Sequence, residues 1–104
     1  VGSGEMYGVR RDKNNAPEIR SGATPTQNAD QPVGKWNRFE ITVLDGRVSV
    51  ALNGKQVLAG VQPPDLPKKG RIGFQHHGAK KDGQWTSSPS LMQYRNIFIK
   101  ELNP

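Results

Sequence analysis

The sequence predicts an all-β protein built from antiparallel strands. Apolar and polar residues alternate with a period of two through most of residues 38–52, which is the pattern of strands that bury one face. Asp45-Gly46 and Asn53-Gly54 interrupt and end this alternation, and both pairs are typical of tight hairpins because their residues tolerate positive φ. No segment shows a convincing helical period. The short strands and frequent turn signals favour a β-sandwich.

The first half of the chain contains the clearest strand signals. Residues 1–34 are rich in Gly, Asn, Pro, Ala and Thr, and they predict an irregular segment with one short strand over residues 5–9. The two alternating runs, together with residues 56–59, then predict a three-strand antiparallel meander. Three prolines and two adjacent lysines make residues 62–70 a loop.

The second half is expected to add two further strands. Residues 71–75 predict a short strand, and residues 78–90 are polar and rich in turn-forming residues. Residues 92–102 predict the longest strand, because β-branched and aromatic residues are most frequent there. The total is about five or six strands. A jelly roll of two full sheets needs about eight, so the sandwich is expected to be incomplete in this chain.

Length and composition limit the classes of protein that remain. A chain of 104 residues forms at most one small domain, and its 33% content of hydrophobic residues predicts a thin core. The sequence contains no cysteine, which excludes disulfides, and no apolar stretch is long enough to span a bilayer. Because it begins with Val1 and not with Met, the chain is expected to be processed, recombinantly trimmed or cut from a longer polypeptide.

The net charge of +6 raises the question of a nucleic-acid partner. The basic residues, however, are spread over small separate groups, and no zinc-finger spacing or aromatic-basic ribonucleoprotein motif accompanies them. Ordinary surface charge explains them, so nucleic-acid binding is not expected.

The two histidines of the chain are adjacent, at His76 and His77, at the end of a short predicted strand and before Gly78. An imidazole at the mouth of such a loop can act as an acid, a base or a metal ligand near neutral pH. The alternative is that both histidines are solvated turn residues with no chemical role.

Four short motifs occur in a fixed order along the chain: Gly34-Lys35-Trp36-Asn37, Leu52-Asn53-Gly54, the run from Gly70 to Gly78, and the run from Tyr94 to Lys100. In this order and spacing, they resemble the 3-keto-disaccharide hydrolase family over residues 2–102. The resemblance implies a concanavalin-like jelly roll and a periplasmic or extracellular location. It covers the C-terminal half of that family, so it implies that a missing N-terminal half or a second chain completes the single domain formed by residues 1–104.

The family resemblance also implies a carbohydrate substrate, a glycoside whose sugar carries a ketone at C3. The ketone acidifies the proton on C2, so a base can form an enediolate that expels the aglycone from C1, after which water adds. Such a site needs a base, a group that stabilises the enolate oxygen, and hydrogen-bonding groups for hydroxyls. At the matching positions, the resemblance implies that His77 is the base or the ligand of a divalent cation. Arg95 then stabilises negative charge, and Gln75 and Asn96 hold hydroxyls.

Several roles stay open at this point. Strand alternation places Arg95 and Asn96 on opposite faces, so only one of them can point into a cleft unless a bulge intervenes. His76 occupies a position where relatives are expected to have an acid, and Trp85 is either a sugar-stacking platform or a loop anchor. Asn37, which follows Trp36, either forms a turn or has a functional role.

Two other functions compete with the enzymatic one. The same fold serves carbohydrate-binding modules without catalysis, and a fold does not determine function. An ordinary retaining glucanase is disfavoured, because its mechanism needs two carboxylates about 5 Å apart and no strand here carries an alternating pair of acids. The enzyme and the binding module differ in whether His77 faces a concave pocket with other titratable groups.

Overall fold

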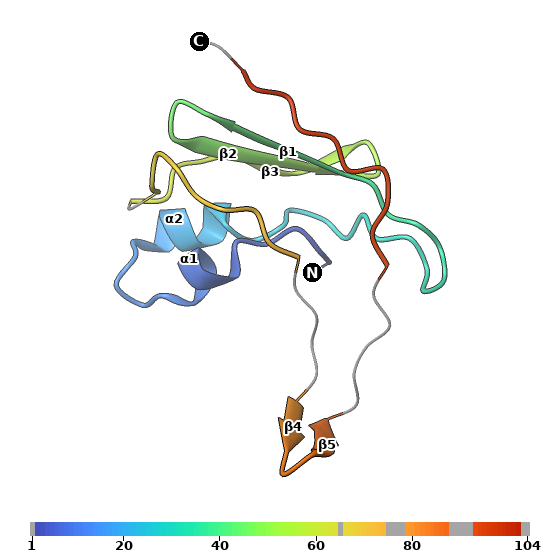
Figure 1. Cartoon of the computed structure of the whole chain (residues 1–104). Helices are drawn as coiled ribbons and strands as arrows, with labels where there is room; N and C mark the ends of the chain where they lie inside the picture. The colour runs from blue at the N-terminus through green and yellow to red at the C-terminus, as the bar shows by residue number, and fades with distance from the viewer. Residues whose placement is uncertain (1, 65, 75–78, 88–92, 103–104) are drawn as a thin grey trace. The chain divides into compact units, whose positions relative to one another are not determined.

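The computed structural model describes residues 2–64, 66–74, 79–87 and 93–102 (Figure 1). These residues form two compact units, one that ends at Lys68 and one that begins at Lys69. The first unit contains a three-stranded antiparallel sheet and two short helices, and the second contains a two-stranded hairpin. The prediction of antiparallel strands is confirmed, whereas the described residues show a partial sheet in place of a two-sheet sandwich.

The sheet consists of β1 (Phe39–Leu44), β2 (Arg47–Leu52) and β3 (Lys55–Val61), which pair in sequence order. This arrangement is the predicted meander. The two turns have positive φ at Asp45 and Gly46 and again at Asn53 and Gly54, as tight hairpins require. Local sequence therefore predicts the three strands and their order in this sheet.

The core lies on one face of β2 and β3. Val48, Val50 and Leu52 are buried on β2 while the residues between them are partly exposed, as the alternation predicts. On β3 two consecutive residues, Val57 and Leu58, are fully buried. Their burial follows from a break in register, because Leu58 pairs with Val50 and Gln56 pairs with Ala51, which leaves Val57 as an extra residue on β3.

Two helices cover this face and correct two predictions from the sequence. Helix α1 (Tyr7–Arg11) occupies the place of the strand expected over residues 5–9, and α2 (Pro17–Gly22) lies in a segment expected to be irregular (Figure 1). Each helix has only one to two turns, which is too short to show an apolar period. Pro17 at the first position favours the start of α2 because its fixed φ is already helical. Helix α1 contacts α2, and α2 contacts β3.

Strand β1 remains uncovered within the described part of the first unit. Phe39, Ile41 and Val43 pair with buried residues of β2 and therefore lie on the same face, yet their exposed fractions are 46%, 65% and 55%. We call these three residues the β1 strip. Helix α2 thus packs on β3, the partly buried Met6, Val9 and Leu66 pack against the core, and the apolar side chains of β1 are left open.

The second unit corrects the predictions for the end of the chain. Strands β4 (Ala79–Lys81) and β5 (Gln84–Ser87) form a hairpin within the segment expected to be polar and turn-rich. Residues 71–74 and 93–102, by contrast, belong to no strand, so the strands predicted over 71–75 and 92–102 are wrong for these residues. Asn96 has φ of 54°, which interrupts an extended backbone. Ile97, Phe98 and Ile99 are exposed.

The helices do not suggest a membrane-spanning segment. Among the residues that the structure describes, no helix is both long and apolar enough to cross a bilayer.

Candidate functional site

The predicted catalytic cluster is only partly within the described residues. Three of its members lie outside them: Gln75, His76 and His77. Trp85 lies on β5, where its backbone pairs with that of Lys80, and Arg95 and Asn96 lie in the segment 93–102. The assembly of these six residues into one site stays a prediction.

One contact in the second unit brings the two predicted site motifs close to each other. The rings of Phe74 and Tyr94 lie with their centroids 4.7 Å apart at an interplanar angle of 51°. This tilted geometry is favourable for aromatic pairs. Phe74 directly precedes Gln75 and Tyr94 directly precedes Arg95. The ring pair therefore brings together the residue that precedes Gln75 and the residue that precedes Arg95.

The conformation of Asn96 bears on whether Arg95 and Asn96 face the same way. Strict alternation holds only in extended chain, and Asn96 adopts the left-handed conformation with φ of 54°. Asparagine enters this region more readily than most residues because its side chain bonds locally. The expectation that Arg95 and Asn96 must face opposite ways therefore does not apply to this segment.

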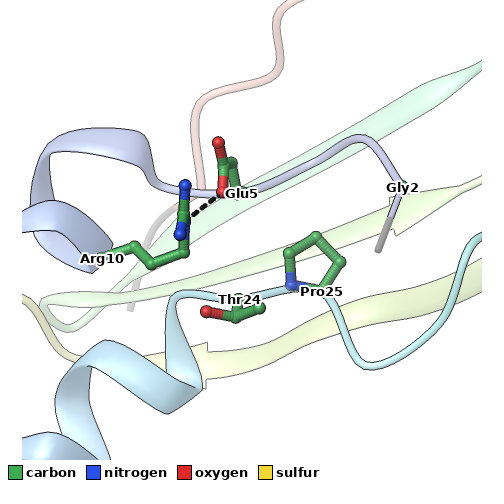
Figure 2. Close-up of a pocket in the computed structure, with 5 residues that line it drawn as sticks. All are labelled: Gly2, Glu5, Arg10, Thr24 and Pro25. Carbon is green, nitrogen blue, oxygen red and sulfur yellow. Dashed lines mark ion pairs between the residues drawn. The ribbon is translucent and has the colours of Figure 1, made fainter.

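A polar pocket that the sequence did not predict lies in the first unit. It has a volume of about 300 Å³ and is lined by Gly2, Glu5, Arg10, Thr24 and Pro25 (Figure 2). Arg10 comes from α1, Glu5 precedes that helix, and Thr24 and Pro25 follow α2. The carboxylate of Glu5 forms an ion pair with Nε of Arg10. We call this cavity the Glu5–Arg10 pocket.

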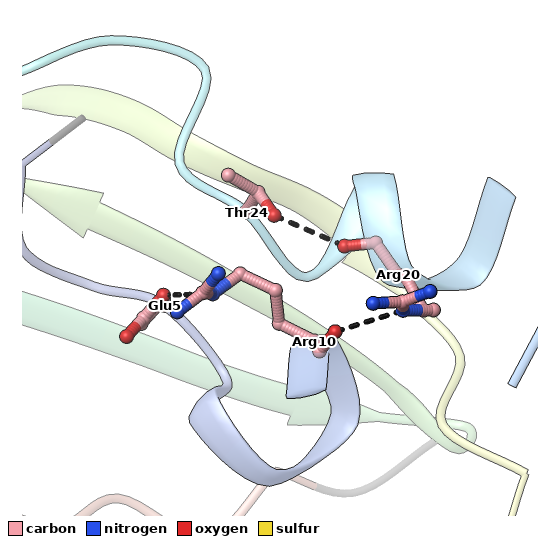
Figure 3. A network of polar contacts seen from close by, with 4 residues as sticks. All are labelled: Glu5, Arg10, Arg20 and Thr24. Atoms are coloured by element: carbon pink, nitrogen blue, oxygen red, sulfur yellow. Dashed lines mark hydrogen bonds and ion pairs between the residues drawn. The ribbon is translucent and has the colours of Figure 1, made fainter. Parts of the chain in front are cut away.

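Hydrogen bonds hold the walls of this pocket in place. Nε of Arg20 donates to the backbone oxygen of Arg10 over 2.9 Å, and the Thr24 hydroxyl donates to the backbone oxygen of Arg20 over 3.0 Å (Figure 3). The backbone N–H of Met6 also donates to the oxygen of Ala23 over 3.0 Å. The chain segments on either side of the cavity are thus linked both to each other and to α2. In the sequence, an acid and an arginine five residues apart within an irregular segment gave no sufficient signal of this pocket.

Asn53 and Asn37 both have structural roles. Nδ2 of Asn53 donates to the backbone oxygen of Ala29 over 2.7 Å and to Oδ1 of Asn37 over 2.9 Å, while its Oδ1 accepts from the backbone N–H of Arg38 over 2.9 Å. Oδ1 of Asn37 also accepts from the backbone N–H of Gln31 over 2.8 Å. The hairpin role expected of Asn53 is confirmed, and its side chain additionally anchors the segment before β1.

The described residues offer no metal centre. Among them, no group of three or more His, Cys, Asp or Glu side chains could hold a metal ion. His76 and His77 are not among the residues described, so the divalent cation stays a prediction that concerns those two positions.

Comparison with known protein families shows the family of this chain. It belongs to the family of 3-keto-alpha-glucoside-1,2-lyase-like domains, whose model matches residues 1–100. The resemblance drawn from the four sequence motifs is therefore confirmed. Comparisons with curated proteins and with solved structures found no match.

Proposed function

We propose that this chain is the glycoside-processing domain of an enzyme that cleaves 3-keto-glycosides by elimination. The observation that carries the proposal is the family match over residues 1–100. The contact between Phe74 and Tyr94 supports it, because it joins the two motifs whose following residues supply the proposed site.

The proposed reaction is an elimination followed by an addition. A base removes the proton from C2 to give an enediolate; the C3 carbonyl then re-forms as the electron pair makes the C1–C2 double bond and the bond from C1 to the aglycone oxygen breaks. The aglycone leaves with a proton, and water then adds its hydroxyl to C1 and its proton to C2. Negative charge develops on the C3 oxygen in the first step, so donors directed at that oxygen lower the barrier.

The residues of the second unit have the chemistry that these steps need. His77 is proposed as the base, and Arg95 is proposed to stabilise charge on the C3 oxygen. Gln75, Asn96 and His76 are proposed to bind hydroxyl groups of the sugar, and Trp85 is proposed to stack against the ring. A divalent cation, if His77 binds one, would supply further stabilisation of the enolate oxygen.

Turnover in heavy water tests this mechanism. We expect a chromogenic 3-keto-glucoside to release its aglycone and to acquire deuterium at C2, because the proton added in the second step comes from solvent. The unoxidised glucoside is the matched control, and we expect no turnover of it since its C2 proton is not acidic. Mass spectrometry of the product, compared with an enzyme-free sample, measures the deuterium.

Two outcomes would contradict the proposal. Product without deuterium at C2, or equal cleavage of the unoxidised glucoside, would indicate direct hydrolysis. Binding of both glycosides without any turnover would favour the non-catalytic carbohydrate-binding module instead.

We also propose that polypeptide outside this chain covers the β1 strip and completes a jelly-roll sandwich. The exposed Phe39, Ile41 and Val43 lie on the face that is buried on β2 and β3, and three strands are too few for that fold. The cover is either a further part of the same protein or a second chain. Apolar side chains grouped on one sheet face are typical of such a contact surface.

Truncation of one strip residue tests this cover. In the protein with its covering polypeptide, Ile41→Ala is expected to lower the free energy of unfolding by about 2–4 kcal/mol, as for a core position. Val33→Ala is the matched control, since Val33 is fully exposed, and it is expected to change the stability by less than about 0.5 kcal/mol. Equal stability of the two variants in urea unfolding would show that the strip faces solvent.

A further inference from the structure

The Glu5–Arg10 pocket contains complementary hydrogen-bonding groups at its wall. A carboxylate accepts hydrogen bonds at two oxygens, and a guanidinium carries five N–H donors. The ion pair joins one oxygen of Glu5 to Nε of Arg10, and Figure 2 shows the other carboxylate oxygen directed away from that nitrogen. The pair therefore places acceptor capacity and donor capacity side by side at the same wall.

The third polar group of the pocket is the Thr24 hydroxyl. Its proton is engaged with the backbone oxygen of Arg20 over 3.0 Å, so toward a ligand the Thr24 hydroxyl acts as an acceptor. The pocket thus offers a neutral combination of one anion, one cation and one hydroxyl acceptor.

The electrostatics and the size of the pocket limit its ligand. The charges of Glu5 and Arg10 cancel, so an anion meets the repulsion of the carboxylate and a cation meets that of the guanidinium. The two side chains are 31% and 34% exposed, which leaves them accessible to a solute. A volume of about 300 Å³ lies at the small end of small-molecule sites and suits one ring.

Two adjacent hydroxyl groups match this arrangement. One hydroxyl donates to the carboxylate of Glu5 while its neighbour accepts from the guanidinium of Arg10. We infer that the Glu5–Arg10 pocket binds one neutral, unoxidised sugar ring through a vicinal diol; the choice of a sugar among polyols rests on the proposed function. A ring oxidised at C3 lacks one of these hydroxyls and is a poorer ligand for this pocket.

The pocket is fixed before a ligand arrives, which reduces the entropy lost on binding. Arg20 anchors Arg10 through its backbone oxygen. The chain beside Gly2 is fixed because Asp30 accepts from both the backbone N–H of Ser3 over 3.0 Å and its hydroxyl over 3.1 Å.

Chemical-shift mapping of the whole chain tests the inference. Methyl α-glucopyranoside is titrated into the ¹⁵N-labelled protein, and the amide resonances of Glu5 and Thr24 are expected to shift in a saturable way. Methyl 3-deoxy-α-glucopyranoside is the matched probe, because it retains the ring and lacks any two adjacent hydroxyls on it. We expect its Kd to be higher by about tenfold or more, the usual effect of losing hydrogen bonds to charged groups.

Substitutions give a second measurement of the same site. Glu5→Gln and Arg10→Gln are each expected to raise the Kd for methyl α-glucopyranoside by about tenfold or more. Arg11→Gln is the control: Arg11 lies over the ring of Tyr7, 5.6 Å from its centroid, and does not line the pocket. If the pocket variants fail to fold, the comparison of the two glycosides on the unsubstituted protein is by itself the test of the inference.

The outcomes separate this inference from the proposed function. Absence of shifts at Glu5 and Thr24, equal affinity for the two glycosides, or unchanged affinity in folded Glu5→Gln and Arg10→Gln overturns the pocket assignment, whatever the turnover of 3-keto-glycosides. Alternatively, the protein could bind methyl α-glucopyranoside saturably and more tightly than the 3-deoxy glycoside, yet not turn over 3-keto-glycosides. That result would support the pocket assignment and overturn only the lyase proposal.

Discussion

Replacing His77 with alanine is expected to lower the kcat for a 3-keto-glycoside by about 10²–10⁴-fold, the usual contribution of a positioned acid or base. The proposed reaction begins with removal of the C2 proton, and an imidazole is suited to this step near neutral pH. The sequence places His77 in a polar loop, so loss of its ring is expected to leave the free energy of unfolding unchanged. Steady-state kinetics with a chromogenic substrate measures the rate, and circular dichroism checks the fold.

His76→Ala is the companion substitution, since His76 is proposed to bind a sugar hydroxyl and not to act as the base. Adjacent residues of extended chain face opposite ways, so a smaller effect is expected from the neighbouring ring. Repeating both assays with a chelator distinguishes an imidazole that acts as a base from one that holds a cation. Full activity in His77→Ala would show that the base has been assigned to the wrong residue.

Replacing Gly4 with alanine is expected to lower the free energy of unfolding by about 3–4 kcal/mol, the sum of overpacking and backbone strain. A Cβ at this position would lie 2.9 Å from Cγ2 of Val57 and 3.5 Å from Cγ1 of Val50, both of which belong to the core. Gly4 also has φ of +107°, a conformation that side chains rarely adopt. Core packing leaves little space for relaxation, so both costs are expected to persist in the folded state.

Gly34→Ala separates the two costs. Gly34 has a similar φ of +95°, but a Cβ there meets no atom within 4 Å. The control therefore contains the backbone strain without the overlap, and we expect it to lose about 1–2 kcal/mol. Urea unfolding followed by circular dichroism measures both variants. Equal losses would mean that the chain near Gly4 moves away from Val57 at no cost.

The parts of the fold that the sequence predicts are those that depend on neighbours along the chain. The meander of β1, β2 and β3 follows from alternating residues and from two turn pairs, which act over a few positions. Helices α1 and α2 could not be predicted, because five or six residues contain too little periodicity. Their position against the sheet depends on contacts with residues distant in the sequence.

The strand expected over residues 92–102 shows the limit of residue preference. Ile97, Phe98 and Ile99 suit a strand by composition, but a strand also needs a partner for its backbone groups. Asn96 adopts a left-handed backbone conformation, and the described residues 93–102 belong to no strand.

For the site, the sequence identified the family from four motifs but not the Glu5–Arg10 pocket. The ion pair joins Glu5, which precedes α1, to Arg10 within that helix, and Thr24 reaches the pocket from the chain after α2. Neither segment carries a sequence signal as strong as the turn pairs of the hairpins. Side chains from short, irregular segments thus meet in ways that spacing alone does not indicate.

The Asn53 side chain has a practical consequence for engineering. It bonds the backbone of Ala29 on one side and that of Arg38 on the other, so both ends of the intervening loop are tied to the end of the β2–β3 hairpin. Val33 near the middle of this loop is fully exposed, and the space around Gly34 is open. Because the cost of closing a loop grows slowly with its length, extra residues at this tip leave the tied ends in place. A fluorescent or affinity tag inserted between Val33 and Gly34 would therefore report on the protein without disturbing the sheet.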